Sequence, residues 1–427
     1  MSAPTAPSFP IERHTLDNGL RVILQPDASL PLVAINLWYH VGSKNERPKR
    51  TGLAHLFEHM LFQGSQHVGT NDHFRYLQQV GGVANGSTWV DRTNYFETLP
   101  AHYLDLGLWL ESDRMGFLLP AIDQKKLDTQ REVVMNERRE RVDNQPYGRA
   151  FERIHELLYP GDHPYHWPVI GYMEDIAAAT LEDLEEFFRT YYAPDNAVLT
   201  LTGELDTQRA LERVIRYFGE IPRGEGVPPV RVDTGHQAGE QHETMADEVQ
   251  LARVYFAYAT PPLGTQEWYA GDLLATALSD GKSSPLYRDL VYEQQIAQDV
   301  SAYNIPMELG STFLLAATAK PEVEIGQVER ALEDQLARAR EEGPSEDDVE
   351  RARQRQLTAI FDRLQSVDER ADLLSMYTTY FDDPQRIFQE FHRYLAIEAS
   401  ELKDFSARFL TSSRRVVLQV VPKDSKQ

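Results

Sequence analysis

The residues best suited to chemistry are His55, Glu58 and His59, which stand close together in one short segment. If this segment is helical, His55 and His59 lie one turn apart on the same face, where two imidazoles can hold one divalent metal ion. Glu58 lies beside His59 on nearly the same face, and a carboxylate there can act as a general base. The spacing therefore predicts a metal site with a built-in base.

A helix over residues 51–62 would position these side chains. The segment contains good helix formers and no proline. Its remaining positions are mostly apolar: Leu53, Leu56, Phe57, Met60, Leu61 and Phe62. We therefore expect a buried helix that shields the metal from bulk water.

A third ligand is needed for catalytic zinc, which takes three protein ligands and leaves one position for water. His-His-Glu is one of the known ligand sets. The charged, strongly helical run 130–140 supplies candidate glutamates. Taken singly, each glutamate there is better explained as part of a solvated helix face, so the pattern alone does not select one.

These residues resemble the inverzincin metallopeptidases of the pitrilysin and insulinase type, whose signature is H-x-x-E-H. Further stretches are similar to landmarks of that family and follow in its order: 14–22 (HTLDNGLRV), 52–55 (GLAH), 81–88 (GGVANGST), 91–95 (DRTNY), 163–165 (HPY) and 168–171 (PVIG). Together they cover most of the first half of the chain, which is far more specific than the pentad alone.

The resemblance implies that His55 and His59 bind Zn²⁺ and that Glu58 is the general base. It implies that Glu137 is the third ligand. Glu132 is the alternative: it lies five residues away, roughly 140° around a helix, so only one of the two glutamates can face the metal. Many family members carry a glutamate seven residues before the ligand, where this chain has Gln130. We expect Gln130 to approach the site without adding negative charge.

The resemblance also implies the activity, that of a zinc endopeptidase that cleaves extended or unfolded peptides. Family members bind such a peptide as an added strand along the edge that corresponds to residues 83–87, where main-chain hydrogen bonds carry the affinity. We expect Ala84, Asn85 and Gly86 to contact the substrate, because small residues permit close approach.

An internal repeat runs through the chain at an offset of 218 residues. It aligns the apolar run 197–201 with 415–419 and the helical residues Leu184 and Phe187 with Leu402 and Phe405. The same offset aligns the early strand 33–38 with 251–256. We predict an α+β protein with two tandem homologous domains, each a mainly antiparallel sheet with helices packed on one face. The predicted divisions are 1–221, a Pro/Gly-rich linker over 222–236, and 237–427.

The second copy lacks the metal residues, because Leu273, Thr276 and Ala277 stand where the first has His55, Glu58 and His59. The family's second half usually supplies an arginine and a tyrosine that stabilise the oxyanion, and here Val291 and Gln298 hold those positions.

These losses suggest a heterodimer, as in mitochondrial processing peptidase, with this chain as the zinc-bearing β-like subunit and a paralogous partner that supplies the arginine and tyrosine. A homodimer with another oxyanion donor is the alternative. A non-catalytic structural or peptide-binding subunit is the other function that stays open.

Composition limits the remaining possibilities. The net charge of −23 disfavours nucleic acid as a partner. No apolar run approaches the roughly 18 to 20 residues of a membrane-spanning helix. The first residues show no basic start and no apolar stretch, which predicts a cytoplasmic location by default, or a periplasmic one if a leader was trimmed. With no cysteine, disulfides and thiolate ligands are excluded and the compartment stays open.

Overall fold

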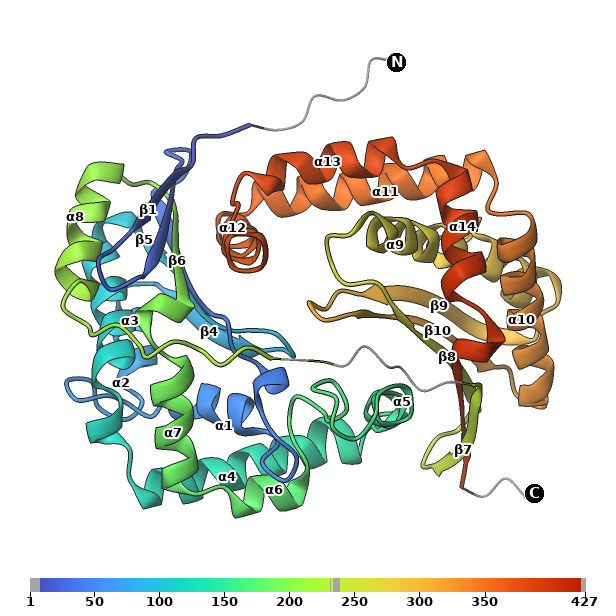
Figure 1. Cartoon of the computed structure of the whole chain (residues 1–427), viewed down its shortest axis with the longest axis horizontal. Coiled ribbons are helices and arrows are strands. Elements are labelled where there is room, and N and C mark those ends of the chain that lie inside the picture. Colours follow the sequence, from blue (N-terminus) through green and yellow to red (C-terminus); the bar gives the residue numbers. More distant parts are fainter. Residues whose placement is uncertain (1–7, 231, 233–238, 424–427) are drawn as a thin grey trace. The chain divides into compact units, whose positions relative to one another are not determined.

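The computed structural model describes residues 8–230, 232 and 239–423. It divides the chain into two compact units (Figure 1). The first comprises Met1–Arg138, Trp167–Arg231 and Phe361–Glu390, and the second comprises Arg139–His166, Val232–Ile360 and Phe391–Gln427. Each unit therefore contains a segment taken from the other half of the sequence.

A six-stranded sheet forms the centre of the first unit. In spatial order its strands are β1 (Glu12–Thr15), β2 (Arg21–Pro26), β6 (Ala197–Gly203), β3 (Leu32–Tyr39), β5 (Thr93–Pro100) and β4 (Val83–Thr88). The pair β2 and β6 is parallel, and every other pair is antiparallel. β4 is consequently an edge strand, and its outer side is not paired within the described sheet.

One face of this sheet packs against the helices of the sequence's first half. Alternation along β3 turns Val33, Ile35 and Leu37 into this core. The helices that the first half of the sequence gives to this unit are α1 (Leu53–Met60), α2 (Asp72–Gln79), α3 (Leu104–Phe117), α4 (Gln124–Arg138), α6 (Met173–Ala178), α7 (Leu181–Tyr191) and α8 (Thr207–Phe218). Among them α1 contacts both β4 and β5, so the predicted metal helix lies next to the edge strand.

The opposite face is covered by α12 (Val367–Phe381), which comes from the second half of the sequence. Ala34 packs with Val367 and Ala371 in a small buried cluster. The Thr202 hydroxyl donates to the Val367 carbonyl at 2.7 Å. This face of the first sheet is therefore buried by a segment that is distant in the sequence.

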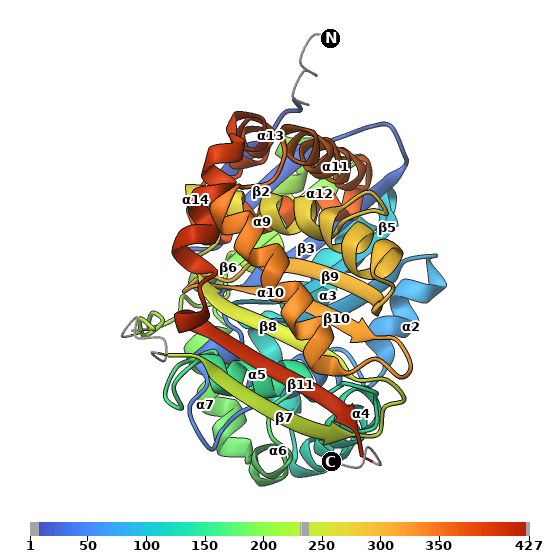
Figure 2. The same ribbon diagram turned by 90° about the vertical axis from the view of Figure 1, so that its right-hand side faces the viewer.

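The second unit repeats this arrangement around a five-stranded sheet. Its spatial order is β7 (Gln241–Asp247), β11 (Arg415–Pro422), β8 (Arg253–Thr260), β10 (Ser311–Ala319) and β9 (Ala297–Ile305), with only β7 and β11 parallel. Figure 2 shows this sheet with α9 (Gln266–Ser279), α10 (Ile325–Glu341) and α14 (Ala399–Phe409) on one face. Two of the residue boundaries between the units fall within the remaining helices, α11 (Glu346–Gln365) and α13 (Arg386–Ala396).

The other face of the second sheet carries α5 (Ala150–Leu158), which comes from the first half of the sequence. Just after α5, the Tyr159 hydroxyl lies 3.1 Å from the Thr312 hydroxyl on β10. The next residue, Phe313, packs on Phe405 of α14. Because neighbouring strand residues point to opposite faces, α5 and α14 cover opposite sides of the sheet.

The two repeats thus exchange equivalent helices. The repeat offset places Ala150, where α5 begins, opposite Asp368 near the start of α12, and each helix packs on the sheet formed by the other half of the sequence. The predicted α+β class with two tandem homologous domains is confirmed, and the structure adds this exchanged helix to each sheet. The division at 221 and 237 stays a prediction, and residues 231 and 233–238 of that region lie outside the described residues.

One repeat alignment needs a correction of a single residue. In the first sheet Tyr39 faces Ala197, whereas in the second sheet Tyr258 faces Arg415. If β6 and β11 match at the offset of 218 residues, β3 and β8 therefore match at an offset that is one residue longer. A repeat that gains a residue in a loop keeps its sheet register, so a sequence alignment at a constant offset misses the change.

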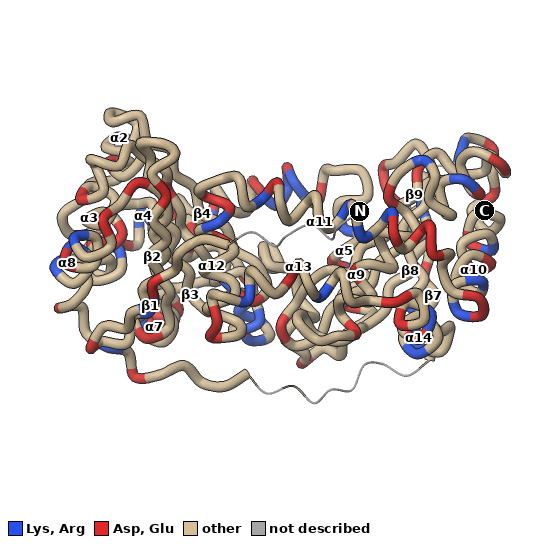
Figure 3. The backbone as a smooth tube through the Cα atoms, turned by 90° about the horizontal axis from the view of Figure 1, so that it is seen from above, with Lys and Arg blue, Asp and Glu red and all other residues tan. Residues whose placement is uncertain are grey.

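Charges of both signs alternate along the outer helices such as α8, α10 and α14 (Figure 3). Ion pairs such as Arg340 with Glu333 in α10 and Arg351 with Asp348 in α11 join opposite charges within one helix. The negative net charge is therefore distributed over the chain. None of the helices in the described ranges is long and apolar enough to cross a bilayer.

Candidate metal centre

The segment that carries His55 and His59 is helical, as predicted, although α1 is shorter than expected and spans Leu53–Met60. The two imidazole rings lie 4.8 Å apart between centroids. Leu53, Ala54, Leu56, Phe57 and Met60 are buried on the same helix, which fixes the face on which the histidines lie. The helix period accordingly brings both rings to one place.

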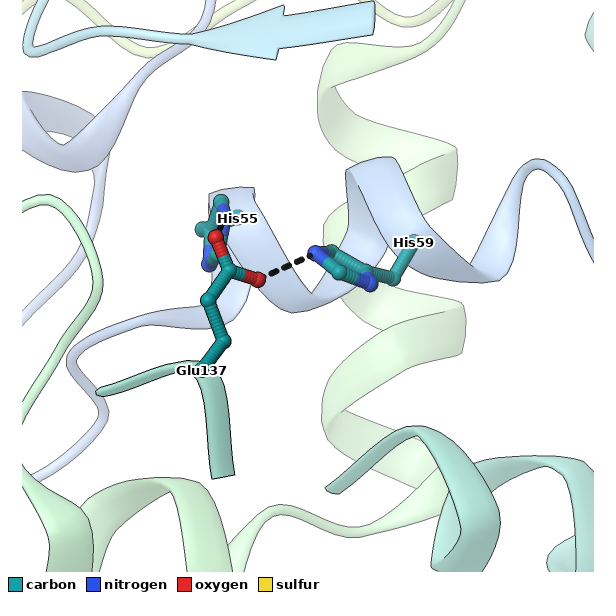
Figure 4. A group of neighbouring side chains, drawn as sticks. All are labelled: His55, His59 and Glu137. Atoms are coloured by element: carbon teal, nitrogen blue, oxygen red, sulfur yellow. Dashed lines mark ion pairs between the residues drawn. The ribbon is translucent and has the colours of Figure 1, made fainter. Parts of the chain in front are cut away.

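Glu137 lies opposite these rings on α4 (Figure 4). Its Oε2 atom is 3.2 Å from His59 Nε2, and its Oε1 atom is 3.9 Å from His55 Nε2. The rival Glu132 is exposed on the same helix. Of the two glutamates left by the sequence, the structure brings Glu137 to the histidines.

The donor geometry of these three residues fits a zinc ion. Their ligand atoms all lie within 4.8 Å of one another. Atoms bound to one tetrahedral zinc at about 2.0 to 2.1 Å lie roughly 3.3 Å apart, so small side-chain adjustments would bring all three onto one ion. Two imidazoles and one carboxylate also form a known catalytic zinc set that leaves a coordination position for water.

Two glycines set the separation between α1 and the segment after Trp167. Gly52 caps α1 with a φ of 82°, and Gly171 has a φ of 81°. A Cβ on Gly171 would lie 2.4 Å from the Cα atom of Gly52, so the two backbones touch where no side chain fits. Arg138, the residue after Glu137, donates to the Gly171 carbonyl at 2.8 Å. The start of α1 and the end of α4 are thereby tied to one turn.

Glu46 caps the buried N-terminus of α1. Its carboxylate accepts hydrogen bonds from the Gly52 and Ala54 amides at 2.9 and 2.8 Å. These amides have no partner within the helix, so the carboxylate satisfies them and complements the helix dipole. Burial raises the pKa of Glu46 well above its ordinary value, while these hydrogen bonds oppose the rise.

Glu58 points towards the edge strand β4. The Thr88 hydroxyl donates to its Oε2 atom at 2.5 Å. Burial raises the pKa of Glu58, while the Thr88 hydrogen bond and the neighbouring His59 oppose that rise. A raised pKa suits a carboxylate that must accept a proton and return it.

The predicted substrate residues Ala84, Asn85 and Gly86 all lie on β4. Asn85 is exposed, and Ala84 and Gly86 are partly exposed. Gly86 is also close to the base, because a Cβ there would lie 3.1 Å from Glu58 Oε1. Their contact with a substrate stays a prediction.

Gln130 is buried on α4, two turns before Glu137, with 6% of its surface exposed. The position agrees with the expected face of the helix. Its role beside the metal stays a prediction.

A second group of possible ligands, among the described residues, is His73, Glu97 and Glu111. Arg114 already donates from Nε and Nη2 to the two oxygens of Glu111, which leaves one excess negative charge on Glu97. Burial, followed by the Glu111 charge, raises the pKa of Glu97 well above its ordinary value. A single proton on Glu97 balances this cluster, whereas a divalent ion would leave it positive, so we do not assign it to metal.

In the second unit the matching positions on α9 are apolar or uncharged. Leu273 and Ala277 are fully buried, and the Thr276 hydroxyl accepts a hydrogen bond from Gln356. No further group of three or more possible ligands occurs in the described ranges, so both such groups belong to the first unit.

Thr88, Glu46 and Gly171 are the residues of the site that the sequence interpretation did not assign. The sequence could have indicated Thr88, because it follows Gly86 by two residues and therefore lies on the same face of the strand. No sequence pattern near Glu46 or Gly171 indicates a role in the site, since each contacts α1 from a separate segment.

Two family models match the chain. The model described as Insulinase (Peptidase family M16) matches residues 21–165, and the Peptidase M16 inactive domain matches residues 178–356. An uncharacterized zinc protease of Mycobacterium leprae is 30% identical over 312 residues, 71% of this chain and 68% of the relative. The chain belongs to the M16 peptidase family. The resemblance to pitrilysin and insulinase is thereby confirmed.

Two further similarities extend over nearly the whole M16 chain. The zinc protease PqqE of Helicobacter pylori is 28% identical over 415 residues, which cover 96% of this chain and 93% of the relative. The crystal structure of a protease from Helicobacter pylori has a TM-score of 0.92 at 27% identity and covers 97% of this chain and 100% of that one. The M16 chain therefore matches such relatives in length as well as in fold.

Proposed function

We propose that this M16 chain is a zinc-dependent endopeptidase that hydrolyses extended or unfolded peptides. The proposal rests on the convergence of His55, His59 and Glu137, with Glu58 beside one of the histidines. Relatives that are named zinc proteases support it.

Each residue has a distinct role in the proposed reaction. Zn²⁺ held by His55, His59 and Glu137 would supply a Lewis acid that activates water and polarises the peptide carbonyl. Glu58 accepts the proton of the attacking water and then donates it to the leaving amine. The Thr88 hydroxyl donates a hydrogen bond to the Glu58 carboxylate, and Gly86 leaves room for that carboxylate beside β4.

The edge strand β4 supplies the binding mode that the proposal needs. An extended peptide can add to its outer side through main-chain hydrogen bonds, with specificity left to alternate side chains. Folded substrates do not offer such a strand, so unfolded chains and short peptides are the expected substrate class.

We further propose that a partner completes the oxyanion site. Val291 has no side-chain hydrogen-bond donor, and Gln298 offers an uncharged amide in place of a tyrosine hydroxyl. A paralogous partner in a heterodimer would supply them, and a homodimer with another donor is the alternative. We expect the purified chain to cleave poorly and a co-expressed pair to cleave well. Equal rates for the chain alone and for the best pairing would contradict the heterodimer.

The peptidase itself is tested by metal content and turnover together. We expect about one zinc per chain in wild type and in Glu58→Gln, because Glu58 is not a ligand. Cleavage of a quenched fluorescent peptide should fall by at least about 10²-fold in Glu58→Gln, because the general base is lost. Bound zinc with no turnover, with or without a partner, would instead favour a non-catalytic peptide-binding or structural subunit.

A further inference from the structure

Two residues on one face of β4 lie beside the Glu58 carboxylate. Gly86 leaves room for Oε1, since a Cβ there would lie 3.1 Å from that atom and 3.2 Å from Cγ. Thr88 donates its hydroxyl to Oε2 at 2.5 Å. Residues 86 and 88 share a face because side chains alternate along a strand. The same strand therefore makes room for one carboxylate oxygen and donates a hydrogen bond to the other.

A glutamate reaches its partners through three rotatable bonds, so its carboxylate needs an external anchor to keep one orientation. α1 fixes only the backbone of Glu58. The hydrogen bond from Thr88 restrains the terminal torsion, and hydrogen bonds to an ionised acceptor are shorter and stronger than neutral ones. Small misplacements of a catalytic group lower the rate steeply.

We propose that Thr88 is a positioning residue that orients the Glu58 carboxylate, so that β4 both receives the peptide and holds the base. This inference rests on the proposed peptidase function. It predicts a particular kinetic pattern. Loss of the Thr88 hydroxyl lowers kcat, because the base is misoriented, and leaves KM nearly unchanged, because the main chain of β4 still pairs with the peptide.

The direct test compares Thr88→Val, which keeps the shape, with Thr88→Ser, which keeps the hydroxyl. We expect kcat to fall about 10- to 100-fold in Thr88→Val with KM within about twofold of wild type. Thr88→Ser should restore most of the rate. Thr98 on the neighbouring strand β5 lies opposite Val83 rather than beside Glu58, so Thr98→Val is the matched control and should leave kcat unchanged.

Two measurements do not depend on turnover. Zinc content should stay at the wild-type level in Thr88→Val, because no ligand is touched. In the metal-free protein, the shifts in unfolding midpoint for Thr88→Val and Glu58→Ala should be non-additive when the two are combined, since each change removes the same hydrogen bond.

Different results would overturn the positioning role of Thr88 and the peptidase function. A Thr88→Val enzyme with normal kcat, a serine variant as slow as the valine variant, or additive unfolding shifts would each overturn the positioning role. If zinc-loaded wild type cleaves no peptide with any partner, the peptidase proposal fails, and the unfolding cycle still decides whether Thr88 and Glu58 are coupled.

Discussion

Gly52 and Gly171 touch through their backbones, and this contact ties the start of the metal helix to the turn that Arg138 holds. Arg138 is the residue after Glu137, so the contact joins the two histidines to the glutamate through one short path. Both glycines have left-handed φ values, which other residues adopt only at a cost. The separation of the proposed ligands therefore depends on two positions without side chains.

We expect Gly171→Ala to disturb both stability and metal binding. The added methyl would meet the Gly52 Cα atom at 2.4 Å, and the φ of 81° is unfavourable for alanine. Strain and overpacking together should lower the free energy of unfolding by about 2 to 4 kcal/mol. Urea unfolding and zinc titration measure the two effects. Gly161→Ala, which has no atom within 4 Å of its added Cβ, is the matched control and should leave both unchanged. A Gly171→Ala protein with wild-type zinc affinity would contradict the proposed link.

Glu137 and Glu132 should differ sharply when each is changed to glutamine. The Glu137 carboxylate faces both histidines, whereas Glu132 is exposed. Loss of one carboxylate ligand should weaken zinc binding by at least about 10- to 100-fold, the size seen even for outer-shell partners. Competition with a chromogenic chelator measures the affinity of each variant. Equal affinities for Glu137→Gln and Glu132→Gln would remove Glu137 from the ligand set.

We expect the fragment 1–221 to be unstable alone, because it lacks α12. Thr200 and Thr202 are fully buried, and their hydroxyls contact Ser375 and the Val367 carbonyl. Without α12, this face of the sheet would be open to water and to other chains. Size-exclusion chromatography and amide hydrogen exchange of β3 and β6 measure the effect.

Co-expression of 222–427 should restore the fragment, since it supplies α12. An Ala371→Arg change in that second fragment should prevent the rescue, because Ala371 is fully buried against Ala34. Asp368→Arg at an exposed position of the same helix is the control and should rescue normally. A monomeric 1–221 fragment with full exchange protection would show that α12 is dispensable.

The buried Glu97 should make stability fall as the pH rises. Burial and Glu111 raise the pKa of Glu97 in the folded protein above the value of about 4.3 in an unfolded chain. Above that lower pKa the unfolded state loses a proton that the folded state keeps, so the penalty grows by roughly 1.4 kcal/mol per pH unit until the folded pKa is reached. Glu97→Gln, which mimics the protonated acid, should remove this penalty.

Urea unfolding of both proteins between pH 5 and pH 9 checks the sign. The stability of Glu97→Gln relative to wild type should rise steadily with pH. His73, whose pKa is lowered by burial and then by Arg114, destabilises both proteins at acid pH and so largely cancels in the difference. A stability difference independent of pH would mean that Glu97 is ionised in the folded protein.

Much of the site follows from local spacing. His55 and His59 meet because the helix period joins residues four apart, and the apolar positions around them select which face is buried. The repeat in the apolar runs likewise predicts two α+β domains, since a duplicated pattern of strands and helices folds twice in the same way.

Tertiary structure alone decided the contacts between segments that are distant in the sequence. Composition and helix spacing do not distinguish Glu137 from Glu132. The family resemblance implied Glu137, and the packing of α4 against α1 brings it to the histidines. Tertiary packing likewise decides that Thr88 contacts Glu58 and that α12 covers the first sheet. Periodicity specifies which side of an element is buried, whereas its partner is chosen by complementary shape and by the hydrogen bonds that remain to be satisfied.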